Sequence, residues 1–241
     1  MLSHAQNFED VTLAGVFAGQ ARGFYIDAGA SDPAVRSVTK NFYDRGWRGV
    51  NIEPVERFHR ALVNERPRDV NLCVALGSGR GSLVFFEFEA EGISTLSSEF
   101  AQHFIQRQFP CAQREVEVVP LREVCEKHCD GRIDFMKIDV EGWERQVLEG
   151  GDWKQFRPRV LLIEATKPNS TEPNWHDWEP FLLARDYLFA YFDGLNRFYV
   201  AREDAVLLRR FPSRLRIFLR SVSLTLAATA RRLVWPRLRA P

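Results

Sequence analysis

Four carboxylates stand where apolar, strand-like runs of the sequence end. They are Asp27, Glu53, Asp139 and Glu164. In an open parallel α/β sheet the carboxyl ends of the strands lie along one edge, and ligands bind in the crevice beyond that edge. A single acid at a strand end is more often a solvated turn residue. Four acids at the ends of four strands, however, predict convergence on one crevice.

The first two acids indicate a site for a nucleoside. Gly29, in the turn Asp27-Ala-Gly-Ala-Ser31, lets the backbone approach a ligand closely. Glu53 ends the next strand, where a carboxylate can accept hydrogen bonds from both hydroxyls of a ribose. The second and third glycines of the dinucleotide motif Gly-x-Gly-x-x-Gly are absent after Gly29. The pattern therefore favours a nucleoside without phosphates, carrying an ammonium group that Asp27 or a neighbouring backbone carbonyl could receive.

The elements that would position these acids alternate between strand-like and helix-like segments. This alternation is typical of βαβ units and predicts an α/β fold with a mostly parallel sheet. Two apolar runs separated by Asp193-Gly194 predict a terminal antiparallel hairpin. We expect core strands at 23–27, 49–53, 70–76, 133–139 and 160–164, extended segments at 82–88 and 115–119, helices at 37–45, 56–65, 121–128, 144–149 and 178–184, and hairpin strands at 187–192 and 197–200.

Charge is divided unevenly along the chain. Its 241 residues carry a formal net charge of +1. Residues 205–241, however, contain nine Arg and neither an acid nor a Lys, which leaves 24 basic against 32 acidic residues in 1–204. An acidic body repels the phosphates of nucleic acids, so we expect no nucleic-acid partner. The length fits one folded domain at 1–205, followed by a basic tail at 206–241.

The tail at 206–241 has the pattern of an amphipathic helix that Ser213 could cap. Its apolar stretch, 217–230, has 14 residues and includes Arg220, so it is shorter than the roughly 20 apolar residues that a membrane span needs. Three interpretations stay open. The helix lies in the interface of an anionic membrane, it docks on the acidic body or on a partner glycosyltransferase, or it is a frayed extension.

The four cysteines, at 73, 111, 125 and 129, are not a disulfide framework for a chain of this size. Cys125, His128 and Cys129 are zinc-ligand types, but a structural zinc site needs four well-spaced ligands, and only Cys111 stands nearby. We interpret this run as a helix with unpaired thiols. No secretory signal is visible at the N-terminus. The sequence therefore predicts a cytoplasmic protein, peripheral to the inner face of the membrane if the tail binds lipid.

With these residues the sequence resembles the FkbM family of S-adenosylmethionine-dependent methyltransferases. The similarity runs in order through roughly residues 1–205, and the tail lies outside it. It includes Gly23-Phe-Tyr-Ile-Asp-Ala-Gly-Ala30 and Asp134-Phe-Met-Lys-Ile-Asp-Val-Glu-Gly142. The remaining matching segments are 3–10, 42–43 with 46–54, 93–96 and 193–200.

The resemblance implies a Rossmann-like class I methyltransferase fold and O-methylation of a hydroxyl on a sugar, glycan or related metabolite. It also implies that the N-terminal segment, with Gln6, Asn7, Glu9 and Asp10, closes over the cofactor. The cofactor-binding residues that it implies are Asp27, Gly29 and Ser31 for the methionine part of S-adenosylmethionine, Glu53 for the ribose, Ala75 and Leu76 for the adenine, and Asp139 facing the sulfonium and the acceptor.

Methyl transfer to a hydroxyl is an in-line displacement, so the enzyme must align the acceptor oxygen and remove its proton. The base must lie within about 3 Å of that oxygen. The candidates are Asp139, Glu164, Glu141 and His176, with Asp139 as the first choice.

A metal-assisted alternative uses two of the same acids. Asp139 and Glu164 could hold one Mg²⁺ that acidifies the acceptor hydroxyl, because hard cations prefer carboxylate and water oxygens. The sequence does not identify a third ligand. Trp175 and Trp178, on either side of His176, are expected either in the core or in a wall on which a sugar stacks.

Two other functions fit the same fold, because a fold does not determine a function. One is an enzyme that binds NAD or a nucleotide-sugar, although the missing glycines count against it. The other is a non-catalytic binding module attached to a membrane by the tail, although the set Asp27, Glu53 and Asp139 argues against lost chemistry.

Overall fold

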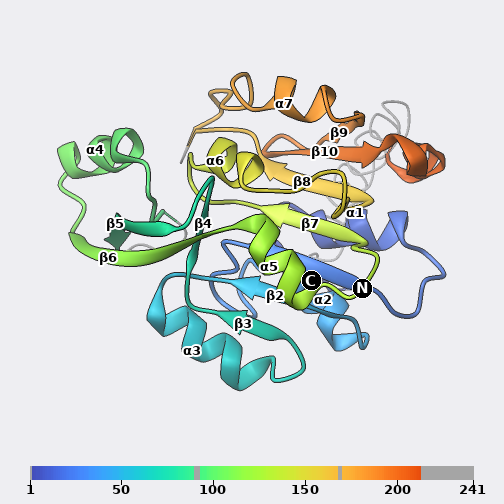
Figure 1. The fold of residues 1–241 in the computed structure, drawn as a ribbon, viewed down its shortest axis with the longest axis horizontal. Coiled ribbons are helices and arrows are strands. Elements are labelled where there is room, and N and C mark those ends of the chain that lie inside the picture. Colours follow the sequence, from blue (N-terminus) through green and yellow to red (C-terminus); the bar gives the residue numbers. More distant parts are fainter. Residues whose placement is uncertain (1, 90–92, 168–169, 213–241) are drawn as a thin grey trace, which may run out of the picture.

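A seven-stranded sheet forms the centre of the protein (Figure 1). The computed structural model describes residues 2–89, 93–167 and 170–212. The strand order is β3-β2-β1-β7-β8-β10-β9, with the first five strands parallel and β10 antiparallel to both of its neighbours. This confirms the Rossmann-like α/β fold and its terminal hairpin. The strands are β1 (Phe24–Ala28), β2 (Arg48–Ile52), β3 (Val70–Leu72), β7 (Phe135–Ile138), β8 (Val160–Glu164), β9 (Tyr187–Phe192) and β10 (Asn196–Ala201).

The central strands are buried on both faces, as their uninterrupted apolar runs require. Successive side chains of a strand point to opposite faces, so Phe135 and Met136 belong to two different core clusters. The cluster around Met136 packs against α5 (Leu121–His128), α6 (Glu144–Glu149) and α7 (Glu179–Leu183). The cluster around Phe135 packs against α1 (Glu9–Val16), α2 (Lys40–Asp44) and the 3₁₀ helix η1 (Arg202–Arg210). Helices therefore cover both faces of the sheet.

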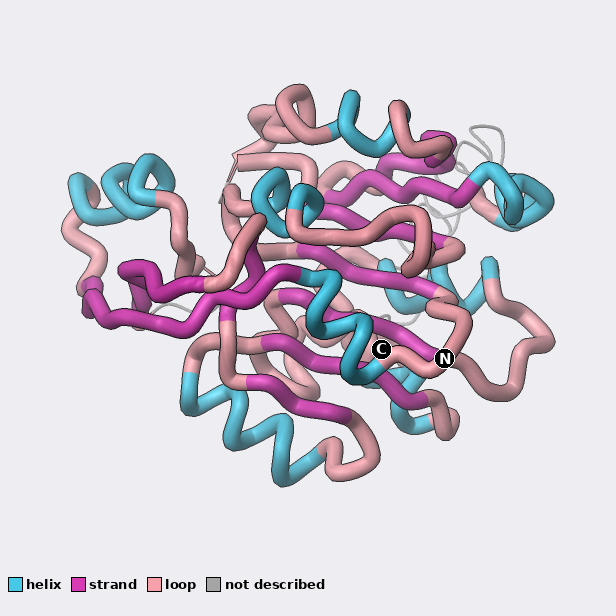
Figure 2. The backbone as a smooth tube through the Cα atoms, viewed as in Figure 1, coloured by secondary structure: helices cyan, strands magenta, loops and turns pink. Residues whose placement is uncertain are grey.

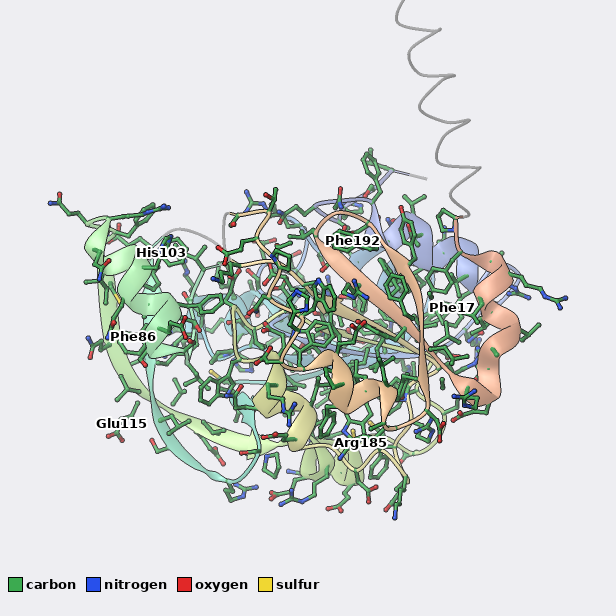
Figure 3. All side chains as sticks on the ribbon, turned by 90° about the horizontal axis from the view of Figure 1, so that it is seen from above. Phe17, Phe86, His103, Glu115, Arg185 and Phe192 are labelled. Carbon is green, nitrogen blue, oxygen red and sulfur yellow. The ribbon has the colours of Figure 1, made fainter. Side chains whose placement is uncertain are left out.

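A second sheet of three strands, in the order β4-β6-β5, forms an arm beside the central sheet (Figure 2). Its strands are β4 (Ala75–Gly77), β5 (Gly81–Phe88) and β6 (Cys111–Pro120), and α4 (Ser98–Gln106) lies between the last two in the chain. Figure 3 shows Phe86, His103 and Glu115 on this arm. The prediction of one strand at 70–76 was wrong, because the chain leaves the central sheet after β3 and enters the arm at β4.

Two boundaries also differ from the sequence predictions. The helix expected at 37–45 is shorter (α2), and the extended segment expected at 115–119 is the ten-residue β6, paired along all of β5. Nearer the N-terminus, Ser3 donates a hydrogen bond to the Asp10 carboxylate (2.6 Å), and α1 begins at Glu9.

Residues 202–211 pack onto the body of the protein. Leu207 and Phe211 are buried in the same cluster as Phe135. The boundary expected after residue 205 therefore falls inside η1. The amphipathic helix expected farther along the tail lies outside the described residues. Among the described helices, none has the length and apolarity to span a bilayer.

Candidate functional site

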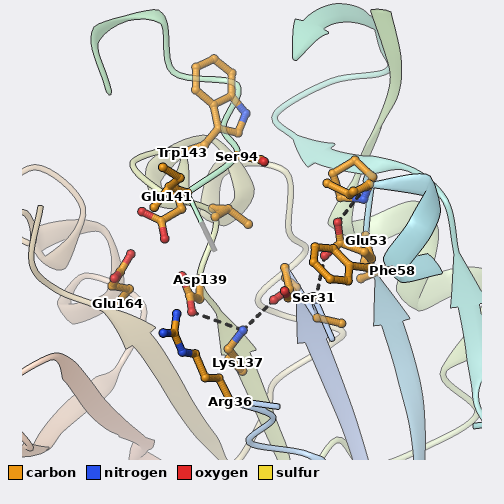
Figure 4. A pocket seen from close by; sticks show the side chains of 18 of the residues that line it. Ser31, Arg36, Glu53, Phe58, Ser94, Lys137, Asp139, Glu141, Trp143 and Glu164 are labelled. Atoms are coloured by element: carbon orange, nitrogen blue, oxygen red, sulfur yellow. Dashed lines mark hydrogen bonds and ion pairs between the residues drawn. The ribbon is translucent and has the colours of Figure 1, made fainter. Parts of the chain in front are cut away.

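A pocket of about 770 Å³ lies at the carboxyl edge of the parallel strands. Glu53, Asp139 and Glu164 line it, as does Gly29. These residues follow or end β2, β7, β8 and β1, so the predicted convergence is correct for three of the four acids. Figure 4 shows Asp139 between Glu53 and Glu164.

Asp27, the fourth acid, does not line the pocket. It is buried (1% exposed), and its carboxylate accepts a hydrogen bond from Thr39 Oγ1 (2.7 Å). Its other oxygen lies 3.3 Å from Lys137 Nζ. The two residues are register partners on β1 and β7, so their side chains meet on the same face of the sheet. The expectation that Asp27 contacts a ligand is therefore wrong, and the structure makes it the partner of Lys137.

Lys137 connects the buried acid to the pocket. Its ammonium donates to the carbonyl of Gly29 (2.7 Å) and lies 3.4 Å from the Asp139 carboxylate. Burial opposes the charge, but the carboxylates of Asp27 and Asp139 outweigh it and raise the pKa of Lys137 above its ordinary value. Sequence reasoning assigned no role to Lys137, although a lysine within an apolar strand was a usable signal.

The turn after β1 is tightly fixed. Gly29 has a φ of +76°, and a Cβ at this position would lie 1.9 Å from the carbonyl oxygen of Asp139. The amides of Gly29 and Ala30 both donate to the carbonyl of Ile52 (3.0 and 3.2 Å). Glycine is therefore required here for the close approach of two strand ends.

Glu53 is the acceptor group at one end of the pocket. Its two carboxylate oxygens accept hydrogen bonds from the amides of Ser31 and Val55, both at 2.7 Å. Burial raises the pKa of Glu53 to about 7, and the two amides oppose this rise. An ionised carboxylate has about four lone-pair sites, so each oxygen can still accept one hydroxyl hydrogen.

An apolar slot adjoins Glu53. The predicted pair Ala75 and Leu76 lines it. Phe58 from α3 (Glu56–Glu65) and Phe85 from β5 add aromatic surface, and neither was predicted. A flat, largely apolar ring fits this slot, because its polar edge can face the solvent while its faces contact side chains.

Three carboxylates meet at the opposite end of the pocket. One oxygen each of Asp139, Glu141 and Glu164 lies within 4.8 Å of the others, and Figure 4 shows the three groups pointing toward one another. Burial, and then the neighbouring acids, raise the pKa values of Glu141 and Glu164 well above their ordinary value. Glu141 was a candidate base in the sequence, and the structure brings it to the two strand-end acids.

The pocket is closed on this side by the N-terminal segment. Gln6 and Glu9 line it. Glu9 Oε1 accepts a hydrogen bond from Asn196 Nδ2 on β10 (2.9 Å), and burial raises the pKa of Glu9 to about 7. The expected covering segment therefore contacts the pocket through these two residues.

His176 lies elsewhere. It is exposed, its ring lies against that of Trp175 (3.8 Å between centroids), and it does not line the pocket. Trp178 is buried in the core (1% exposed), and Trp175 packs under the guanidinium of Arg197 (4.0 Å). Neither tryptophan lines the pocket, so the expected base and sugar-stacking wall do not form there.

The cysteine-rich run forms no metal site in the part of the chain that the structure describes. Cys125 is buried in the core, and its carbonyl accepts a hydrogen bond from the amide of Cys129 (2.9 Å). Within residues 2–89, 93–167 and 170–212, the group with metal-ligand spacing is that of Asp139, Glu141 and Glu164. The helix expected at 121–128 is present as α5.

A comparison with known protein families matches residues 27–189 to the methyltransferase FkbM domain. The chain belongs to the FkbM methyltransferase family. The match begins at Asp27 near the end of β1, stops at Phe189 within β9, and includes Glu53, Asp139 and Glu164. No curated protein matches the chain in a sequence search.

Four pocket-lining residues of this FkbM protein lie outside the matched region, namely Gln6, Glu9, Leu195 and Asn196. Glu9 precedes it and Asn196 follows it, and they hydrogen-bond to each other across the pocket. Segments on both sides of the matched region therefore help to line the pocket. The slot and the Glu53 carboxylate lie within the match.

Proposed function

We propose that this FkbM methyltransferase transfers the methyl group of S-adenosylmethionine to a hydroxyl oxygen of a neutral, polyhydroxylated acceptor such as a sugar or glycan. One observation carries the proposal. A single pocket has a carboxylate and an apolar slot at one end, a carboxylate cluster at the other, and Asp139 between them.

The residues present fit the cofactor. Glu53 accepts the ribose hydroxyls, and the slot with Ala75, Leu76 and Phe58 takes the adenine. Arg36 also lines the pocket and forms no ion pair with another described residue, so its guanidinium can pair with the carboxylate of the methionine part. When bound, the cofactor supplies a methyl group on a positively charged sulfur.

Asp139 acts on the acceptor hydroxyl. It follows β7 directly and its side chain is about one-third exposed (34%), so it is accessible from the pocket. The acceptor oxygen forms a bond to the methyl carbon as the carbon–sulfur bond breaks, and sulfur keeps the electron pair. The hydroxyl proton moves to the Asp139 carboxylate. Lys137, 3.4 Å away, holds that carboxylate in place.

The acceptor class follows from the groups opposite the cofactor end. Glu9, Glu141 and Glu164 are hydrogen-bond acceptors when ionised, and Asn196 and Thr166 are neutral polar groups. Hydroxyl donors complement this surface, whereas a phosphate or a uronate would meet three acids at close range. The proposal therefore excludes phosphorylated acceptors.

Calorimetry with the purified full chain tests the cofactor assignment. We expect binding of S-adenosylhomocysteine but not of NADH or UDP-glucose. Binding of either of the last two without the first would overturn the proposal in favour of the nucleotide-binding alternative, and binding of none would favour a non-catalytic module. Transfer of a labelled methyl group from S-adenosylmethionine to neutral oligosaccharides, with sugar phosphates as the matched comparison, then tests the acceptor class.

A further inference from the structure

The carboxylates of Asp139, Glu141 and Glu164 carry more negative charge than their surroundings balance. Among the described residues, Lys137 is the cation that forms an ion pair with this cluster, through Asp139. Lys137 also forms an ion pair with Asp27. When all three are ionised, carboxylates whose oxygens lie within 4.8 Å of one another repel strongly in a partly buried site. A bound cation would remove this repulsion.

Polar side chains beside the cluster also lack partners. Glu164 is 8% exposed, and its carboxylate makes no hydrogen bond or ion pair with another described residue. Oε2 of Glu141 is fully buried without a hydrogen-bond partner. Thr166, 2% exposed and two residues beyond Glu164, lines the same pocket with its Oγ1 buried and unpaired. Buried polar groups are normally satisfied, so these oxygens indicate a missing ligand.

The spacing of the oxygens fits a hard divalent cation. Ligand oxygens at about 2.3–2.6 Å from Ca²⁺ can lie up to about 5 Å apart across the ion, and those at about 2.0–2.1 Å from Mg²⁺ up to about 4.2 Å. The observed limit of 4.8 Å suits Ca²⁺ as it stands and Mg²⁺ or Mn²⁺ after a small side-chain rotation. Carboxylate ligands also disfavour soft metals.

We propose that Asp139, Glu141 and Glu164 form a divalent-cation site at the acceptor end of the pocket. The three carboxylates supply three ligand oxygens, and water or the acceptor hydroxyl completes the coordination. Cation binding follows from the cluster alone, whereas a role in orienting and acidifying the acceptor hydroxyl rests on the proposed function. A carboxylate that ligates through one oxygen keeps the other, so Asp139 can still receive the hydroxyl proton.

Electron paramagnetic resonance of Mn²⁺ titrated into the full chain, without cofactor, tests the site directly. We expect one bound Mn²⁺ per chain, displaced by Mg²⁺ or Ca²⁺ in competition. Glu164→Gln and Glu141→Gln should each weaken binding at least about tenfold, because ligand charge sets the affinity of such sites. Glu126→Gln, the same change at an exposed position on α5, is the matched control and should leave binding unchanged.

Thermal unfolding separates a metal site from a structural role of these acids. Without metal, Glu164→Gln should be at least as stable as the unmodified chain, because it removes a buried charge from a repelling cluster. The unmodified chain should gain stability from millimolar Mn²⁺ or Mg²⁺, and the variant should not. No bound Mn²⁺, or equal binding by all three variants, would overturn the proposal. Binding of S-adenosylhomocysteine, measured in parallel, reports on the proposed function separately.

Discussion

Glu53 gives the proposed cofactor site a pH dependence that can be measured. Burial raises its pKa to about 7, so that the carboxyl group of the free site is mostly protonated at pH 6 and mostly ionised at pH 8. The ribose hydroxyls are hydrogen-bond donors to the ionised form, so binding lowers this pKa. The affinity for S-adenosylhomocysteine should therefore increase about tenfold from pH 6 to pH 8, with most of the gain below pH 7.

Two variants identify the residue responsible. Glu53→Gln should bind with at least about tenfold lower affinity at pH 8, since it loses hydrogen bonds to a charged group worth about 1.5–3 kcal/mol each. Its affinity should be nearly independent of pH. Glu9→Gln is the matched control, because Glu9 lines the opposite end of the pocket and also has a pKa of about 7. Glu9→Gln should retain the increase in affinity from pH 6 to pH 8. Calorimetry at pH 6, 7 and 8 measures the affinity of each variant for S-adenosylhomocysteine. A pH dependence kept by Glu53→Gln and lost by Glu9→Gln would refute the ribose assignment.

The same pKa predicts the direction of a stability change. The folded protein holds a proton on Glu53 that the unfolded chain releases above its ordinary pKa near 4.5. The folded state therefore binds more protons between about pH 4.5 and pH 7, and the free energy of unfolding falls as the pH rises through this window. Denaturant titrations of the ligand-free chain at pH 5 and pH 7.5 measure this change. Greater stability at pH 7.5 would contradict the assigned shift.

Three further predictions concern other parts of the chain. Lys137→Met should lower the free energy of unfolding by about 3–5 kcal/mol, because it leaves Asp27 buried without its cation. Adding Asp27→Asn should restore part of the lost free energy. Additive losses from the two substitutions in denaturant titrations would contradict the pairing. Asp139→Asn should lower turnover about 100-fold or more, while its affinity for S-adenosylhomocysteine stays within threefold of that of the unmodified chain. His176→Ala should leave turnover unchanged. If a methyl-transfer assay shows the loss of turnover in His176→Ala and not in Asp139→Asn, His176 is the base. If the tail binds anionic membranes, the full chain should float with anionic liposomes in a salt-sensitive manner and a chain ending at Pro212 should not; equal flotation would reject this.

The end point of that truncation comes from the structure. Sequence reasoning placed the domain boundary after residue 205, because the run of arginines begins soon afterwards. Leu207 and Phe211, however, pack into the core at 2% and 5% exposure. Removing them would expose a core cluster and mix lost stability with lost membrane binding. Periodicity does not reveal this, because η1 is a 3₁₀ helix of nine residues with a polar, charged surface.

The central strands were predictable because their residues are buried on both faces. A strand such as Val160–Glu164 must be apolar throughout, and that leaves an unmistakable run in the sequence. The separation of β3 from β4 was not predictable in the same way. No glycine or proline interrupts residues 70–76, and the break arises because Ala75–Gly77 pairs with the distant β6. Long-range pairing of this kind has no local signal.

The error at Asp27 has a geometric cause. Glu53 and Asp139 each follow the last residue of their strands, Ile52 and Ile138, and therefore project beyond the sheet edge. Asp27 stands one residue before the end of β1, which continues to Ala28, so its side chain stays on the face of the sheet beside Lys137. A shift of one residue along a strand separates a ligand-binding acid from a buried one. Sequence patterns place strand ends less accurately than that.

The origin of the pocket walls indicates where acceptor specificity can be changed. The end of the pocket around Glu53, where we propose that the cofactor binds, is lined by residues at the ends of β1 and β2 and by residues of the arm, all inside the matched FkbM region. The other end, where we propose that the acceptor binds, also uses Glu9 from the N-terminal segment and Asn196 from β10, both outside it. The end around Glu53 is held by its own contacts, such as those of Glu53 with Ser31 and Val55, so we expect substitutions at Glu9 or Asn196 to leave it intact. Under the proposed function, changes of charge and shape around Glu9 and Asn196 should therefore alter the choice of hydroxyl while the cofactor geometry is kept.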